Sequence, residues 1–232
     1  MAIIDKPSDY FDTKLYTGNG GTQSITGLDF QPDWVWIKDR DDTYKQMLVD
    51  SVRGATKHLS SNSDAAEITN TANVTSFTSD GFALSSDGNV NANADKYASW
   101  NWKESATAGF DIVSYSGTGS AKTVSHNLGV KPDVIICKSR SGAEEWRVYS
   151  SYLGATKALR LNGTNAEDTD SGYWNNTEPT SSVFTVGTNG GTNGNGVTFI
   201  AYCFASVKGY SKFGSYTGNN NANGTFVYTG FK

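Results

Sequence analysis

Short runs of apolar residues alternate with turn-forming residues along the whole chain. Within each run aromatic and β-branched side chains are frequent, and the residues between the runs are mainly glycine, asparagine, serine and aspartate. This pattern is typical of short β-strands, and no long stretch shows a helical period. The run at 33–39 is apolar on both faces, which predicts a strand buried between two layers. In the first half of the chain the predicted strands cover residues 11–17, 22–28, 33–39, 44–50, 56–60, 74–78, 81–85 and 97–103.

The turn residues predict two hairpins within this first half. Gly18–Gly21 reads Gly-Asn-Gly-Gly and separates residues 11–17 from residues 22–28. Ser79 and Asp80 separate residues 74–78 from residues 81–85 in the same way. Glycine, asparagine and aspartate at such short connections favour tight turns between antiparallel strands.

The same pattern returns about 100 residues later. The offset from Pro32 to Pro132 is 100 residues, and so is the offset from Gly54 to Gly154. A unit of this length has the usual size of a whole domain and is too long for a solenoid repeat. The matching motifs are Tyr16-Thr17-Gly18, Tyr115-Ser116-Gly117 and Tyr216-Thr217-Gly218; Pro32-Asp33 and Pro132-Asp133; and Gly54–Lys57 and Gly154–Lys157.

We therefore expect tandem domains. Seven or eight strands in each unit predict two tandem β-sandwiches of the jelly-roll or concanavalin A-like type. Residues 213–218 and 225–231 predict a C-terminal hairpin that opens a third repeat. Two interpretations of this hairpin stay open: a truncated third repeat, which we favour, or docking on the edge of the second repeat. The expected boundaries are a lead-in at 1–9, the first repeat at 10–104, a linker at 105–109, the second repeat at 110–207 and the third opening at 208–232.

Composition limits the partners. The net charge is −4, only 18% of the residues are charged, and lysine and arginine are scattered along the chain. Nucleic-acid binding needs a basic surface, so we expect no nucleic-acid partner. No apolar run is long enough to predict membrane insertion. Cys137 and Cys203 lie in apolar runs of the second repeat, where we expect buried free thiols.

Several long motifs resemble a known family. Tyr10–Gly20, Gly27–Lys38, Asp50–Gly54, Phe199–Ala205 and Gly209–Gly218 are similar to the repeat domain of marine bacteriophage tail or tail-fibre-associated proteins of the cyanophage type. The resemblance implies a virion protein with a β-sandwich fold and a role in host attachment, made in the host cytoplasm. The implied partners are a host-surface glycan or receptor, other virion proteins and further copies of the chain, as in a trimer. It assigns no catalytic or binding residue.

The second repeat departs from one of these motifs. Ser150-Ser-Tyr-Leu-Gly154 stands where the first repeat has Asp50-Ser-Val-Arg-Gly54. An ion pair between Asp50 and Arg53 is therefore not a requirement of the repeat fold.

The chain offers little catalytic chemistry. His58 and His126 occupy non-equivalent positions and have no nucleophile motif nearby, so we interpret both as structural. Asp39, Asp41 and Asp42 are adjacent carboxylates that predict a solvated turn at a strand end, and glycoside cleavage would need two carboxylates facing each other across a groove. We therefore expect no enzyme.

One loop carries candidate metal ligands. Residues 165–172 place Asp168 and Asp170 in an alternating pattern before a glycine, as calcium loops do. The loop has no counterpart in the first repeat and lacks the distant glutamate of an EF-hand. Calcium is thus a weak candidate beside the simpler interpretation, an acidic surface loop, and we expect no other cofactor.

Some tryptophans are predicted to lie in the core, and one is predicted to lie in a binding site. Trp34, Trp36, Trp100 and Trp102 align with apolar or aromatic residues of the second repeat, which predicts core positions, and Trp146 is ambiguous. Tyr173, Trp174, Asn175 and Asn176 differ because they lie in a polar loop. An aromatic ring beside amides predicts a platform on which a sugar ring stacks, so these four are the candidate ligand-binding residues. The alternative is that the two rings plug the open end of the sandwich.

Three functions follow from these patterns, in order of preference. The first is non-catalytic receptor or glycan binding, in which repetition adds avidity. The second is a purely structural role, in which the repeats space or decorate a fibre. A polysaccharide depolymerase comes third, because the two repeats share no constellation of carboxylates or histidines.

Overall fold

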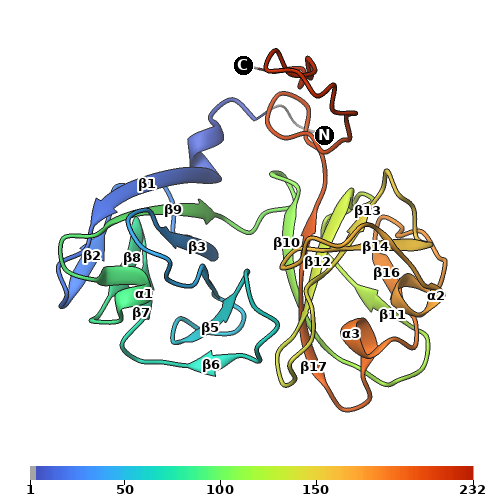
Figure 1. Ribbon diagram of the computed structural model, residues 1–232, viewed down its shortest axis with the longest axis horizontal. Coiled ribbons are helices and arrows are strands. Elements are labelled where there is room, and N and C mark those ends of the chain that lie inside the picture. Colours follow the sequence, from blue (N-terminus) through green and yellow to red (C-terminus); the bar gives the residue numbers. More distant parts are fainter. Residues whose placement is uncertain (1–3, 232) are drawn as a thin grey trace.

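The structure is a computed structural model that describes residues 4–231, and it confirms an all-β chain. Most predicted strands form within a few residues of their expected bounds, and the helices are single turns (Figure 1). The lead-in contains η1 (Pro7–Asp9). The first repeat contains β1 (Phe11–Thr17), β2 (Gln23–Ile25), β3 (Trp34–Asp39), β4 (Met47–Asp50), β5 (Lys57–Ser60), β6 (Ile68–Thr69), β7 (Val74–Thr78), β8 (Gly81–Leu84), α1 (Gly88–Asn91) and β9 (Lys96–Trp102). The second contains β10 (Phe110–Ser116), β11 (Lys122–Ser125), β12 (Val134–Ser139), β13 (Arg147–Ser150), β14 (Lys157–Arg160), β15 (Asp168–Thr169), α2 (Ser171–Trp174), β16 (Val183–Val186), α3 (Gly190–Asn193) and β17 (Thr198–Phe204).

The sequence repeat is also a repeat of topology. The first repeat forms a six-stranded sheet in the order β1-β9-β3-β4-β5-β6 and a three-stranded sheet, β2-β8-β7. The second forms a six-stranded sheet in the order β10-β17-β12-β13-β14-β15 and a two-stranded sheet, β11-β16. Strand for strand, the large sheets have the same order, so the first strand of each repeat pairs with its last strand.

The first predicted hairpin is therefore wrong. β1 pairs along its whole length with β9, whereas β2 pairs with β8 in the other sheet. Between them the chain crosses from one sheet to the other at Gly18, where a Cβ atom would overlap the carbonyl oxygen of Ala92. The Gly18–Gly21 segment has the composition of a hairpin turn, but it connects strands of two different sheets. The hairpin predicted around Ser79 and Asp80 is correct, because β7 pairs with β8.

Each pair of sheets encloses an apolar core. In the first repeat Val35 and Ile37 of β3 face Phe82 and Leu84 of β8. The second repeat builds the equivalent core from the corresponding strands. Because side chains alternate along a strand, Trp34 and Trp36 point from the opposite face of β3.

The outer faces of the two large sheets pack against each other. Trp34 lies between the repeats, and its ring stacks on Tyr202 at 4.3 Å and on Phe110 at 5.6 Å between ring centroids. The predicted linker, residues 105–109, is a tight turn closed by a bridge between Ser105 and Phe110. The two lobes of Figure 1 thus share a third apolar cluster in addition to their own cores.

A buried polar network seals one side of this interface. The Asp50–Arg53 ion pair exists, and both side chains are 0% exposed. Tyr202 of the second repeat donates a hydrogen bond to Asp50 Oδ2 at 2.6 Å. Arg53 also pairs with Glu67, and Arg140 of the second repeat holds Glu67 through two hydrogen bonds of 2.9 and 3.0 Å. The Asp50–Arg53 pair serves the contact between the two repeats. This explains why the second repeat folds without an equivalent pair.

Trp146, which the sequence left undecided, belongs to the same interface. Its side chain is 0% exposed, and its indole Nε1 donates to the carbonyl oxygens of Ser60 at 2.9 Å and Ser63 at 3.1 Å. It therefore binds the second repeat to the loop that follows β5.

The C-terminal hairpin is not formed. Between Lys212 and Phe231 the described chain contains no β-strand. Two hydrogen bonds connect the predicted arms: Lys212 Nζ donates to the Tyr228 carbonyl, and Thr225 Oγ1 donates to the Thr217 carbonyl. An isolated two-stranded hairpin is marginal in water, and the complete repeats show that these two strands belong to different sheets.

Candidate functional site

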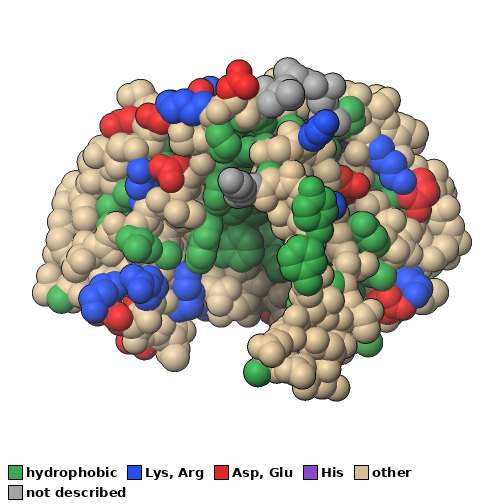
Figure 2. All heavy atoms as spheres, turned by 90° about the horizontal axis from the view of Figure 1, so that it is seen from above, with side chains coloured by type: hydrophobic (Ala, Val, Ile, Leu, Met, Phe, Trp, Pro, Cys, Tyr) green, Lys and Arg blue, Asp and Glu red, His purple; other side chains and the backbone are tan. Residues whose placement is uncertain are grey.

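A cleft lined by aromatic side chains opens between the two repeats. Its volume is about 330 Å³, and Figure 2 shows the hollow between the lobes with hydrophobic side chains along its walls. One wall is the outer face of β1, β9 and β3, and the other comes from β10, β12 and β17. The lining residues are Phe11, Trp34, Trp36, Trp102, Ala108, Phe110, Val134, Ile136, Phe204, Tyr210, Ser211 and Phe213.

Strand register explains why the tryptophans gather on this wall. Trp102 lies directly between Phe11 and Trp34 across three neighbouring strands. In the next row Trp100 lies between Thr13 and Trp36. Cross-strand partners share one face of a sheet, so the two rows form a continuous aromatic surface.

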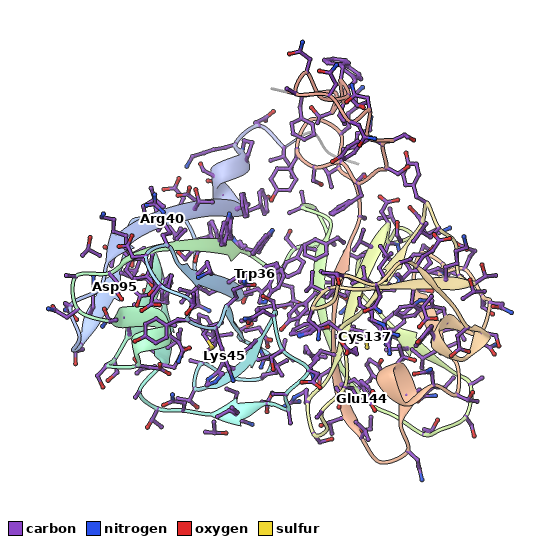
Figure 3. The ribbon with its side chains drawn as sticks, viewed as in Figure 1. Trp36, Arg40, Lys45, Asp95, Cys137 and Glu144 are labelled. Atoms are coloured by element: carbon purple, nitrogen blue, oxygen red, sulfur yellow. The ribbon has the colours of Figure 1, made fainter. Side chains whose placement is uncertain are left out.

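Only part of this surface is covered by the second repeat. Trp34 is 1% exposed beneath Tyr202, whereas Trp36, Trp100 and Trp102 remain partly exposed. These three rings line a shallow depression of about 210 Å³ beside the cleft. Figure 3 shows Trp36 directed from the first lobe toward the space between the lobes.

The rings keep fixed distances from one another. The centroid of Trp34 lies 4.5 Å from that of Trp102, and Trp36 contacts Trp100 edge-on at 6.4 Å. Such offset and edge-on contacts are the preferred geometries of aromatic pairs. Packing on neighbouring rings thus restrains the tryptophans, and side chains that are restrained before binding lower its entropic cost.

The cleft is electrically neutral. None of its lining side chains is charged, and its hydroxyls come from Tyr210 and Ser211. Burial raises the pKa of Tyr210 to about 12, with a contribution from Tyr10, so this hydroxyl stays protonated at neutral pH. An anionic ligand would lose hydration here without gaining a cation as its partner, so the cleft disfavours anions and favours ligands with apolar faces.

The two aromatic residues of the predicted sugar platform are buried. Tyr173 and Trp174 lie on α2 and are 3% and 1% exposed, and Trp174 packs edge-on against Tyr149 at 5.8 Å. No face of either ring is open for stacking, a placement that fits the alternative in which the rings plug the sandwich. Asn175 and Asn176 are exposed and take positive φ angles of 53° and 49°, so they turn the chain after the helix.

The candidate calcium ligands are occupied by other partners. Asp168 Oδ2 accepts hydrogen bonds from Tyr173 at 2.8 Å and from Arg160 at 3.3 Å. Asp170 caps α2 by accepting from the backbone of Gly172 at 2.7 Å. Within residues 4–231 no group of three or more His, Cys, Asp or Glu side chains is arranged to hold a metal ion. In the structure both carboxylates thus bind neighbouring groups of the second repeat.

The histidines and Asp39 are buried. His58 and His126 are both 5% exposed, and burial lowers the pKa of each imidazole. Asp39 is 1% exposed rather than solvated, and it accepts hydrogen bonds from the backbone of Asp41 and Asp42. The turn is therefore held by a buried carboxylate.

Cys137 and Cys203 are free and buried, as predicted. Cys137 lies in the core of the second lobe (Figure 3), where the Tyr115 hydroxyl is 3.0 Å from its sulfur. Burial raises the pKa of the Cys137 thiol to about 12, so the reactive thiolate is absent at neutral pH.

Comparison of the sequence with models of protein families shows the family of the chain. A model described as a domain of unknown function, DUF7483, matches residues 6–232. The chain belongs to the DUF7483 family. The DUF7483 match spans both repeats and the C-terminal segment, so all three lie within one family unit. No curated protein and no solved structure matches the chain. Within its described residues this DUF7483 chain has no helix that is long and apolar enough to cross a membrane.

Sequence reasoning missed the tryptophan surface of this DUF7483 chain. Trp36 and Trp100 align with Ile136 and Tyr202, and we assigned all of them to a core because they lie on apolar strand faces. The sequence signal that indicates an exposed tryptophan is the difference in residue type between the two repeats at an aligned position. A position that a smaller residue fills in one repeat does not need tryptophan for packing in the other.

Proposed function

We propose that the chain is a non-catalytic attachment module of a bacteriophage tail or tail fibre, and that it binds a neutral host-surface glycan in the interlobe cleft. The tryptophan surface carries this proposal. Trp36, Trp100 and Trp102 lie side by side, partly open, beside a cleft that has no charged lining. The resemblance to phage tail repeats supplies the biological setting.

The chemistry of sugars fits this surface. A pyranose ring presents a face of C–H groups to an aromatic ring, while its hydroxyls stay at the edge of the ring. On the open tryptophan surface these hydroxyls can remain in water, and Tyr210 and Ser211 offer neutral hydrogen-bonding groups within the cleft. A single site of this kind is weak, so presentation of many copies on a virion would supply the avidity.

The finer fold assignment belongs to the same proposal. We regard residues 10–104 and 110–207 as two domains of the jelly-roll or concanavalin A-like type. The support is that each has a large and a small sheet around a core of its own, with the same strand order in the large sheets.

A structural spacer is the second candidate. Its support is the sealed contact between the repeats, where stacked aromatic rings and the buried Asp50–Arg53 pair fix one lobe on the other. A depolymerase remains the least favoured function, because no carboxylate lines the cleft.

The test is binding of a multimeric form of the full chain to an array of glycans that includes polysaccharide from candidate host cells. We expect neutral glycans to bind. Trp36→Ala and Trp100→Ala should each weaken binding by about 2- to 13-fold, since one aromatic contact contributes about 0.5–1.5 kcal/mol.

Tyr152→Ala is the matched control, because Tyr152 is 59% exposed and does not line the cleft. Urea unfolding should show that all three variants are folded under the binding conditions, although the tryptophan variants lose some packing within the interlobe cluster. Binding that survives both tryptophan substitutions would remove the cleft from consideration. A folded multimer that binds no glycan would favour the spacer.

A further inference from the structure

The C-terminal segment, residues 211–231, repeats the local conformation with which both complete repeats begin. Two residues after the glycine of each Tyr-Thr/Ser-Gly motif the backbone turns left-handed, with φ of 69° at Gly20, 71° at Gly119 and 52° at Asn220. Further on, Gly27 and Gly230 have φ of 86° and 85° within matching Thr-Gly pairs. The segment thus has the turns of a first and second strand without the strands.

In the complete repeats the motif tyrosine packs on the end of the same repeat. Tyr16 stacks on Tyr97 at 5.1 Å, and its hydroxyl donates to the Val90 carbonyl at 2.8 Å. In the second repeat Tyr115 stacks on Phe199 at 5.2 Å and donates to the Thr192 carbonyl at 2.7 Å. Both contacts reach the last strand and the helical turn that precedes it.

The motif glycine fits against that same turn. A Cβ atom on Gly18 would overlap the Ala92 carbonyl, and one on Gly117 would overlap the Gly194 carbonyl. The backbone N–H of Gly18 donates to Asp95 at 2.8 Å, and that of Gly117 donates to Val197 at 2.8 Å. The motif is therefore one half of a contact whose other half lies about 75 residues further along the chain.

In the C-terminal segment the motif tyrosine and glycine do not make this contact. Tyr216 is 71% exposed, and nothing lies within 4 Å of the Cβ position of Gly218. Phe226 and Tyr228 are 86% and 71% exposed, although Ile25, which aligns with Tyr228 through the matching Thr-Gly pairs, is 6% exposed. Contiguous exposed aromatic residues of this kind mark an interaction surface.

The two complete repeats cannot supply the partner. β9 already lies between β1 and β3, and β17 lies between β10 and β12. We infer that residues 211–231 are a docking segment whose partner is the remainder of a further repeat of the same kind. That partner would provide a last strand for residues 213–218 to pair with, and the helical turn that accepts Tyr216 and Gly218.

The test supplies this partner within one chain. Residues 30–104 of the first repeat are appended after Lys232, and hydrogen exchange is compared between this extended chain and the 232-residue chain. In the extended chain the amides of residues 213–218 should exchange at least about 100-fold more slowly, as paired strands do. The appended residues should fold cooperatively.

The matched control is the extended chain with Tyr216→Ala and Gly218→Val. Both changes act on the exposed segment, so the first two repeats should keep their stability while the protection of residues 213–218 is lost. Rapid exchange of the segment in the extended chain, or appended residues that stay unfolded, would overturn the inference. Concentration-dependent protection in the 232-residue chain would also overturn it, because the partner would then be a second copy.

Discussion

Replacing Arg53 by leucine should be among the most destabilising single changes in this protein. The Arg53 side chain is 0% exposed and donates to Asp50, to the Leu48 carbonyl at 2.9 Å and to the Tyr202 hydroxyl at 3.3 Å. Without the guanidinium, the Asp50 carboxylate stays buried with no cation beside it. Breaking a buried ion pair in this way costs about 3–5 kcal/mol.

The second repeat provides the compensating change. It has Ser150 and Leu153 where the first repeat has Asp50 and Arg53. The double substitution Asp50→Ser with Arg53→Leu leaves no stranded charge, so it should recover most of the loss. The remaining cost comes from the Tyr202 hydroxyl, which loses its acceptor, and is about 1–3 kcal/mol.

Urea unfolding of the wild type, the two single variants and the double variant measures this coupling. A thermal melt should show a decrease of about 6–20 °C for Arg53→Leu, given about 2–4 °C for each kcal/mol in a chain of this size. Lys157→Leu is the control because its ion pair with Glu167 is partly exposed, and it should cost at most about 1 kcal/mol. The reasoning is refuted if Arg53→Leu costs less than about 1 kcal/mol, or if the double variant is no more stable than Arg53→Leu.

Three further outcomes test other parts of the structure. Burial raises the pKa of Glu104 from its usual 4.5 to about 7, aided by Asp111, so stability should fall as the pH rises from about 4.5 through 7, and Glu104→Gln should flatten that part of a stability–pH curve. Trp174→Ala should cost about 3–5 kcal/mol in urea unfolding because it empties a fully buried site, and a loss under 1 kcal/mol would contradict this placement. Cys137 and Cys203 should react with a thiol reagent only at the rate of unfolding; rapid labelling of the native protein would show that they are accessible.

The strands and the repeat could be read from the sequence because both depend on local patterns. Alternating apolar residues and turn residues place β1, β3, β7 and β9 to within one residue of their predicted bounds. The buried thiols followed from the same apolar runs. Whether a segment forms a strand or a turn depends mainly on residues that are close in sequence, so the order of residues is enough to predict it.

Strand partners could not be read in this way. The Gly18–Gly21 turn has the composition of a hairpin, yet β1 pairs with a strand that begins about 80 residues later. The choice depends on Gly18 passing beneath the Ala92 carbonyl and on Tyr16 stacking on Tyr97, two contacts between distant parts of the chain.

The candidate site was also decided by tertiary structure. An aromatic residue in a polar loop resembles a surface platform, but Trp174 is buried because α2 folds it against Tyr149. Trp36 and Trp100 resemble core residues, but they are partly open because the second repeat buries Trp34 and leaves the neighbouring tryptophans incompletely covered.

The sequence by itself determined an all-β chain, its internal repeat and which strand faces are apolar. The tertiary structure alone decided what each apolar face meets: the repeat's own small sheet, the neighbouring repeat, or solvent. The physical reason is that burial is a property of two surfaces in contact. A strand encodes its own surface, and the partner becomes known only when the sheets are placed in space.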